Sequence, residues 1–221
     1  MRQLADDLYQ IPVMPFSSVN AYFAGGVLFD AGTRQSKGTL LKALRGHAVA
    51  AHALTHAHAD HQGSSHAVCE ALGIPLWCGA ADANAMITGR FETLIPQSAV
   101  TRLIDAVWTG PPHPVDRRLE EGDEVGGFTV IETPGHSPGH VVFWRERDRA
   151  LIIGDVLRNM SYATLRSGLR EPPAAFTPDP ALNRASARKL LGLDPAVVAF
   201  GHGPPLRDPG RFNEFVSNLA A

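Results

Sequence analysis

The feature that most constrains this chain is a cluster of metal-binding residue types that follows a predicted strand. The segment His56-Ala57-His58-Ala59-Asp60-His61 places four such side chains within six residues. The preceding residues, His47 to Thr55, read as a buried strand. In an extended chain, residues two apart point the same way, so His56 and His58 can converge on one ion. If the chain then turns into a helix, Asp60 and His61 swing towards an adjacent position, and one loop can serve two metals.

Three more metal-capable residues each lie just past a β-prone run. His136, Asp155 and His202 come after Phe128 to Glu132, Ala150 to Ile153 and Ala196 to Phe200. A single histidine is usually an ordinary core or surface residue, so the grouping carries the prediction. Because ligands at the carboxyl ends of several strands gather along one edge of a sheet, we expect all seven residues to meet there.

The remaining segments predict strands joined by turns and helices. The expected strands are Leu8 to Val13, Ala21 to Phe23, Gly26 to Asp30, Ile74 to Cys78 and Val141 to Trp144, and the expected helices are Gly38 to Leu44 and Ser64 to Leu72. The order strand, helix, strand around Ser64 to Leu72, which stops at Gly73, implies a parallel pairing. The stretches Gly110 to Pro114 and Glu171 to Pro180 predict long loops.

Length and charge bound the class of protein. A chain of 221 residues, 44% hydrophobic, predicts one domain over residues 1–221. With 20 Lys and Arg against 22 Asp and Glu, it has no basic footprint for nucleic acid or a membrane surface, which favours a small-molecule substrate. No long apolar run and no basic-then-apolar start is present, so we expect a cytoplasmic protein. Cys69 and Cys78 are expected to be two buried thiols.

The order and spacing of the motifs resemble the metallo-β-lactamase fold superfamily. The motifs are Thr-His-Ala-His-Ala-Asp-His, Thr-Pro-Gly-His, Gly-Asp and Gly-His-Gly, and the similarity runs from about Tyr9 to about His202. It includes Asn20-Ala21-Tyr22 and Phe29-Asp30-Ala31-Gly32 near the start. The resemblance implies an α/β fold, a four-layer αββα sandwich of two mixed β-sheets with outer helices and metals at one edge.

The resemblance also implies a ligand set and a mechanism. It assigns His56, His58 and His136 to a first metal, Asp60, His61 and His202 to a second, and Asp155 to both. Imidazole and carboxylate ligands suit two zinc ions, although iron or manganese accepts the same set. Two ions roughly 4 Å apart would lower the pKa of a bridging water, and the resulting hydroxide would attack the scissile bond. Asp60 is the candidate catalytic proton shuttle.

Other residues are candidates for supporting or substrate-binding roles. His140, in a Thr-Pro-Gly-His-Ser-Pro-Gly-His run that resembles the glyoxalase II branch, is expected to orient a ligand, as are Thr55 and Asp30. Local turn bonding is the competing interpretation for these three. Arg158, Asn159 and Tyr162 lie where family members build part of the substrate pocket, although such arginines are often simply solvated. His47, His52, His66 and His113 show no partner spacing and are treated as ordinary.

Several reactions stay open. The first hypothesis is hydrolysis of an acyl bond, with thioesters ahead of lactones and β-lactams. The chain ends 19 residues after His202, which argues against the glutathione-binding helical domain of hydroxyacylglutathione hydrolases. The absence of an export signal argues against a β-lactamase. The second hypothesis is a persulfide dioxygenase with one iron on His56, His136 and Asp155. His140, where that branch tends to carry cysteine, argues against it.

A phosphodiesterase is a minor alternative. A helix over Phe212 to Leu219 either caps the fold or forms a homodimer contact.

Overall fold

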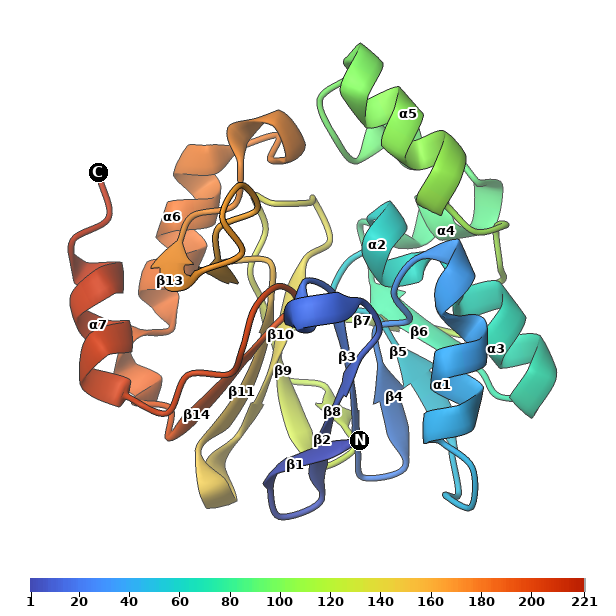
Figure 1. Ribbon diagram of the computed structural model, residues 1–221, viewed down its shortest axis with the longest axis horizontal. Helices are drawn as coiled ribbons and strands as arrows, with labels where there is room; N and C mark the ends of the chain where they lie inside the picture. Colours follow the sequence, from blue (N-terminus) through green and yellow to red (C-terminus); the bar gives the residue numbers. More distant parts are fainter. Residues whose placement is uncertain (221) are drawn as a thin grey trace.

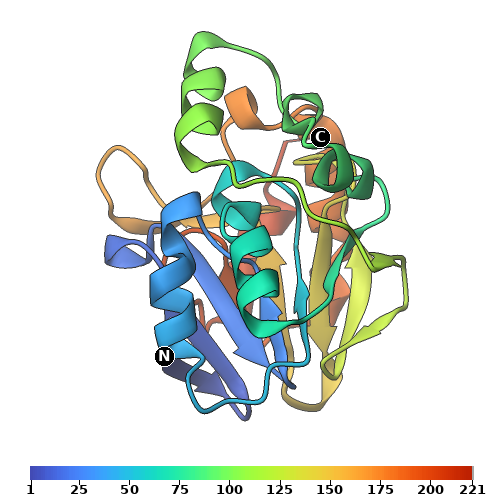
Figure 2. The ribbon, with the colours of Figure 1, turned by 90° about the vertical axis from the view of Figure 1, so that its right-hand side faces the viewer.

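Two β-sheets packed face to face between outer helices make up the computed structural model, which describes residues 1–220 (Figures 1 and 2). The first sheet has seven strands in chain order: β1 (Arg2–Ala5), β2 (Leu8–Pro12), β3 (Asn20–Ala24), β4 (Val27–Phe29), β5 (Ala51–Ala53), β6 (Leu76–Gly79) and β7 (Arg117–Leu119). Strands β1 to β4 are antiparallel and β4 to β7 are parallel.

The second sheet has the order β14-β11-β10-β9-β8. Its strands are β8 (Glu124–Val125), β9 (Phe128–Glu132), β10 (Val141–Arg145), β11 (Ala150–Gly154) and β14 (Val197–Phe200). Strands β8 to β11 are antiparallel, and β14 pairs parallel to β11. A separate hairpin is formed by β12 (Arg158–Met160) and β13 (Ser167–Arg170). Both large sheets are mixed, as the αββα prediction requires.

Helices cover the outer faces of the two sheets. They are α1 (Lys37–Ala43), α2 (Ala59–Gln62), α3 (Ser65–Leu72), α4 (Ala83–Thr88), α5 (Ala99–Trp108), α6 (Pro180–Lys189) and α7 (Pro209–Ser217). Helices α1 and α3 lie over the first sheet and α6 and α7 over the second, while α5 projects above the sheet edge (Figure 1). Among residues 1–220, none of the helices is long and apolar enough to cross a bilayer.

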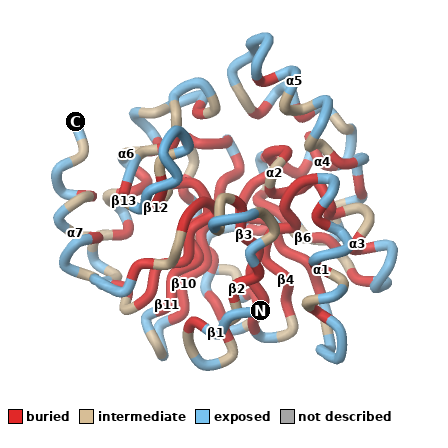
Figure 3. Tube along the Cα trace, in the orientation of Figure 1, coloured by how far each residue is buried: buried red, intermediate tan, exposed pale blue. Residues whose placement is uncertain are grey.

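Buried side chains form three layers that match this arrangement, and the central strands are buried along their length (Figure 3). Between the sheets, the rings of Phe29 and Phe143 pack edge to face with centroids 4.7 Å apart. Phe212 and Val216 of α7 are fully buried with the outer layer of the second sheet. The C-terminal helix therefore caps the core, and it extends over Pro209–Ser217 instead of the predicted Phe212 to Leu219.

The βαβ prediction is confirmed, with one correction. Strands β5 and β6 pair parallel across α3, which ends at Gly73 in the left-handed conformation that glycine favours. Cys69 and Cys78 are buried free thiols, as expected. The strand predicted over His47 to Thr55 is wrong in extent, because only Ala51–Ala53 is strand. Its parallel partner β4 begins at Val27, so residues before Ala51 have no strand to pair with.

Candidate metal centre

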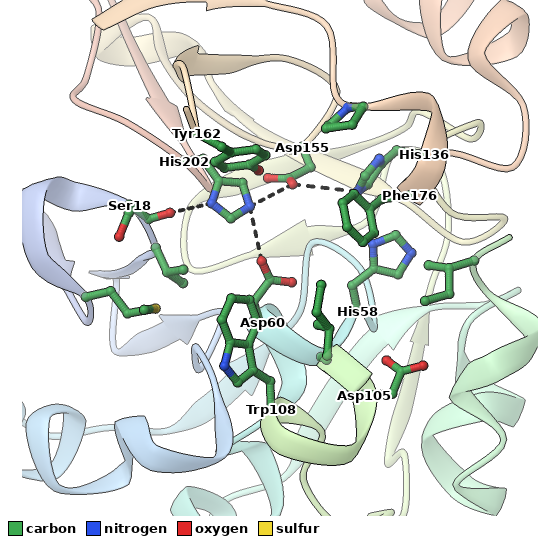
Figure 4. Close-up of a pocket in the computed structure, with 16 residues that line it drawn as sticks. Ser18, His58, Asp60, Asp105, Trp108, His136, Asp155, Tyr162, Phe176 and His202 are labelled. Atoms are coloured by element: carbon green, nitrogen blue, oxygen red, sulfur yellow. Dashed lines mark hydrogen bonds and ion pairs between the residues drawn. The ribbon is translucent and has the colours of Figure 1, made fainter. Parts of the chain in front are cut away.

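The seven residues singled out by the sequence meet at one edge of the sandwich. They follow the carboxyl ends of four strands: residues 56 to 61 come after β5, His136 after β9, Asp155 after β11 and His202 after β14. One ligand-type atom from each of His56, His58 and His136 lies within 4.8 Å of the others, and the same holds for Asp60, His61 and His202. The structure thus brings together two neighbouring groups of three. Figure 4 shows the members that line the cavity: His58, Asp60, His136 and His202.

Asp155 lies between these two groups. Its Oδ2 is 2.9 Å from Nε2 of His202 and 3.6 Å from Nε2 of His136, and its Oδ1 is 3.5 Å from Nε2 of His61. Asp60 reaches the same place from α2, with Oδ2 3.3 Å from Nε2 of His202. A carboxylate in this position contacts members of both groups.

Three of the histidines have their outer nitrogen fixed by an atom that can only accept. His61 Nδ1 donates to Asp30 Oδ2 over 2.9 Å, and His58 Nε2 donates to the Leu94 carbonyl over 3.3 Å. His202 Nδ1 donates to the Ser18 carbonyl. A neutral imidazole carries one proton. Because that proton lies on the outer nitrogen of each ring, the nitrogen that faces the centre has a free lone pair.

The other two histidines are fixed by threonine hydroxyls. The Thr55 hydroxyl donates to Asp30 and so accepts from His56 Nδ1 at 3.0 Å. The Thr177 hydroxyl donates to a backbone carbonyl and accepts from His136 Nδ1, also at 3.0 Å. All five rings are therefore held in the tautomer whose inward nitrogen can bind a cation, which is the arrangement typical of metal-ligating histidines.

Four of the inward-facing atoms lack a hydrogen-bond partner among the described residues. His56 Nε2, His61 Nε2, His136 Nε2 and Asp155 Oδ1 are buried and have no hydrogen bond among the described residues. A buried polar atom left unpaired costs about 1–3 kcal/mol, so four in one place call for another bonding partner. Divalent cations fit this donor set, since imidazole nitrogens and carboxylate oxygens are ligands that zinc and iron accept.

Electrostatics divide the histidines into two kinds. Burial lowers the pKa of His56 and His136 well below the usual range, so both rings are neutral and ready to bind a cation. Burial alone would also lower the pKa of His61, but Asp30 and Asp155 outweigh it and raise that pKa to about 9. Asp155 likewise outweighs burial and raises the pKa of His202. A cation entering here must therefore displace protons from His61 and His202.

Asp30, Thr55 and His140 support the centre from behind. Asp30 adopts a left-handed conformation, with φ 59°, and its carboxylate accepts from the Thr55 backbone and hydroxyl as well as from His61. His140 donates Nδ1–H to Thr133 and accepts the Asp155 backbone N–H on Nε2. His140 thus has no free nitrogen for a metal and instead fixes the backbone of Asp155.

A cavity of about 300 Å³ opens onto this centre, and its walls are mainly apolar (Figure 4). The apolar lining side chains are Met14, Val19, Ile95, Ile104, Trp108 and Phe176. Its charged lining residues, besides histidines, are the carboxylates Asp60, Asp105 and Asp155, and among residues 1–220 no lysine or arginine lines it. The cavity wall therefore suits an apolar group and offers no lysine or arginine to bind an anionic one.

The three predicted substrate residues have different surroundings. Tyr162 lines the cavity, with its ring 5.3 Å from that of His202. Arg158 stacks behind Tyr162 at 4.4 Å and donates to the carbonyls of Met160 and Glu171. Asn159 is buried and bonds to the backbone of Gly168 and Pro204. Tyr162 is therefore the one of the three that lines the cavity.

Comparisons with known proteins agree with this geometry. Residues 14–202 match the model of the metallo-beta-lactamase superfamily. A probable metallo-hydrolase of Bacillus subtilis, YflN, is 30% identical over 201 residues, covering 81% of this chain and 76% of YflN. A hydroxyacylglutathione hydrolase of Bdellovibrio bacteriovorus is 29% identical over 127 residues, which cover 56% of this chain and 40% of that enzyme.

Solved structures add two informative neighbours. TTHA1623 in a di-iron-bound form is 33% identical, with a TM-score of 0.69, and the match covers 94% of this chain and 99% of that one. The B3 metallo-beta-lactamase BLEG-1 is 30% identical, with a TM-score of 0.67, and the match covers 96% and 100% of the two chains. The αββα architecture thus recurs in proteins whose names state a metal or a hydrolytic activity.

Proposed function

Since the chain belongs to the metallo-β-lactamase superfamily and is a metal-dependent hydrolase, we propose that it holds two divalent ions and hydrolyses a thioester or lactone with an apolar acyl group. The observation that carries the proposal is the set of five histidines whose outer nitrogens are all engaged, with the inner nitrogens of His56, His61 and His136 left without a hydrogen bond. A set with a single metal would not need this second group of ligands.

The residues divide between the two ions according to their grouping. His56, His58 and His136 would hold the first, Asp60, His61 and His202 the second, and Asp155 lies where it touches both groups. Bound there, the ions would supply an activated water and polarise the substrate carbonyl. Zinc suits the donor set, and the di-iron form of a 33% identical relative supports iron as the alternative.

Asp60 is the residue best placed to move a proton. It lines the cavity, its side chain is 20% exposed, and one oxygen already faces His202. A carboxylate here can take the proton released when water attacks and pass it to the leaving group.

We predict that Asp60→Asn lowers kcat by about a hundredfold or more, which is the lower end of what a positioned acid–base group contributes. The amide keeps an oxygen that can still bind a metal but cannot carry the proton. Steady-state kinetics on protein of measured metal content test this. A variant that keeps both ions and full turnover would refute the role.

The cavity wall limits the class of substrate. Ile104 and Trp108 of α5 face Phe176 across the opening, so an acyl chain attached at the metals would be covered by apolar side chains. Outside the proposed ligand set the wall carries one carboxylate, Asp105, and no lysine or arginine lines it among residues 1–220, so no side chain there would bind the phosphate of a phosphodiester or the carboxylates of glutathione. The lining of the cavity therefore favours a lactone or a thioester with an uncharged acyl group over an anionic substrate.

We expect kcat/KM to rise about fourfold for each methylene added to an unbranched acyl thioester until the cavity is filled, since a buried CH₂ contributes about 0.8 kcal/mol. Trp108→Ala should flatten that slope with little effect on an acetyl substrate. The same assay with a lactone series and a β-lactam tests the alternatives, because the likeness to BLEG-1 favours the β-lactam as a second candidate. A flat series, or preference for an anionic substrate, would overturn the acyl-chain assignment.

A further inference from the structure

A second cluster of metal-binding side chains lies outside the candidate centre. His66 and Glu70 stand one turn apart on α3, and His113 reaches them from the segment between α5 and β7. One ligand-type atom from each of the three lies within 4.8 Å of the others. Residues four apart on a helix share one face, so His66 and Glu70 both point at His113.

The two imidazoles approach each other through the same kind of atom. Nδ1 of His66 is 3.1 Å from Nδ1 of His113. Two nitrogens bound to one tetrahedral zinc at about 2.0–2.1 Å lie about 3.3 Å apart, so the pair already has nearly the spacing of two ligands of one ion. The pair sharing one proton in a hydrogen bond is the competing interpretation.

Burial and charge favour the cation. His113 is 9% exposed, His66 is half-buried and Glu70 is at the surface, so an ion can enter from solvent past the carboxylate. Burial, followed by the neighbouring His66, lowers the pKa of His113, which leaves that ring neutral at pH 7. The charged residues that act on His113 are the carboxylates Glu70 and Asp116, so the local field attracts a cation.

We propose that His66, Glu70 and His113 form an additional site for a zinc-like divalent ion, separate from the candidate centre. The ion would clamp the segment 109–116 to α3. That segment leaves the end of α5, which supplies Ile104 and Trp108 to the cavity wall. An ion at this site would therefore hold in place the segment that follows α5, the helix that covers the proposed substrate cavity.

The test is a zinc titration of the purified protein with its resident metals in place, followed by equilibrium dialysis. Wild type should bind one more Zn²⁺ per chain than His66→Ala, and Glu70→Gln should bind this ion at least tenfold more weakly. His47→Ala is the matched control, because His47 is an exposed histidine that lies outside both clusters. Turnover should be the same in all four proteins before zinc is added.

The difference between wild type and variant reports this site, whether the candidate centre holds one ion or two. Hydrogen exchange of the segment 109–116 provides a second measurement, since the His113 amide donates to the Met86 carbonyl over 2.9 Å. Added Zn²⁺ should slow exchange there in wild type and leave it unchanged in His66→Ala. Equal zinc binding by wild type and His66→Ala would show that the histidines share only a hydrogen bond.

Discussion

Asp155→Ala should lower kcat/KM by about a thousandfold or more and strip both ions from the centre. The carboxylate lies within 2.9 to 3.6 Å of three histidines drawn from both groups, so its loss would remove a ligand from each of the two proposed ions. Losing about 4 kcal/mol of transition-state stabilisation corresponds to a thousandfold in rate, and a bound ion contributes several kcal/mol. Kinetics and plasma mass spectrometry on protein purified without chelators measure both effects.

Asp6→Ala is the matched control, because Asp6 is an exposed carboxylate far from the ligands in sequence. It should keep full activity and metal content. An Asp155→Ala protein with intact fold and unchanged metal content would show that the seven residues do not bind the ions as proposed.

His61→Ala separates two ions from one. In the proposed arrangement His61 belongs to the second ion alone, so the variant should retain one ion per chain out of two. In the alternative with a single iron, held by His56, His136 and Asp155, the metal content should not change. The second outcome would direct attention to oxygen-consuming reactions of persulfides.

The convergence of the seven residues could be predicted from the sequence because each follows a strand. Strands β9, β11 and β14 lie in one sheet and β5 in the other, and their ends meet at one edge, so short loops leave the side chains little freedom. Asp30 and Thr55 could be suspected for the same reason, since each directly or closely follows a strand. Local patterns therefore carried enough information to predict that the seven candidate ligands lie together.

The cavity wall could not be predicted in this way. Helix α5 carries one apolar stripe, because Val100, Leu103, Ile104, Val107 and Trp108 recur with the helical period. Ile104 and Trp108 line the cavity, whereas Val100 and Leu103 are exposed, so the stripe does not show which of its residues line a site. A second local signal was Ser98, which caps the helix by accepting from the Thr101 amide.

The partners that orient His58, His136 and His202 were missed for a different reason. Two of them are backbone carbonyls, of Leu94 and Ser18, and any residue type can supply a carbonyl. The third, Thr177, lies 41 residues from His136. The hairpin β12–β13 likewise has no alternating pattern to reveal it, because its strands have only three and four residues.

Gly201→Ala should lower activity by about a hundredfold or more while the protein stays folded. A Cβ at this position would lie 2.2 Å from Asp155 Oδ1 and 2.6 Å from His61 Cε1, inside the contact distance of both. The backbone cannot retreat, because the Gly201 N–H donates to the Gly154 carbonyl and its own carbonyl accepts from the Asn20 N–H. The added methyl must therefore displace the two side chains.

A displacement of about 1 Å at a catalytic group can cost a hundredfold in rate, whereas overpacking of this size costs about 1–3 kcal/mol of stability. Gly192→Ala is the matched control, since a Cβ there meets nothing within 4 Å. Kinetics, metal content and a thermal melt on both variants decide the matter. The added methyl introduces no charge and removes no ligand. If Gly201→Ala loses activity and metal but still melts cooperatively, the reaction therefore depends on the positions of Asp155 and His61. Full activity in that variant would locate the chemistry elsewhere.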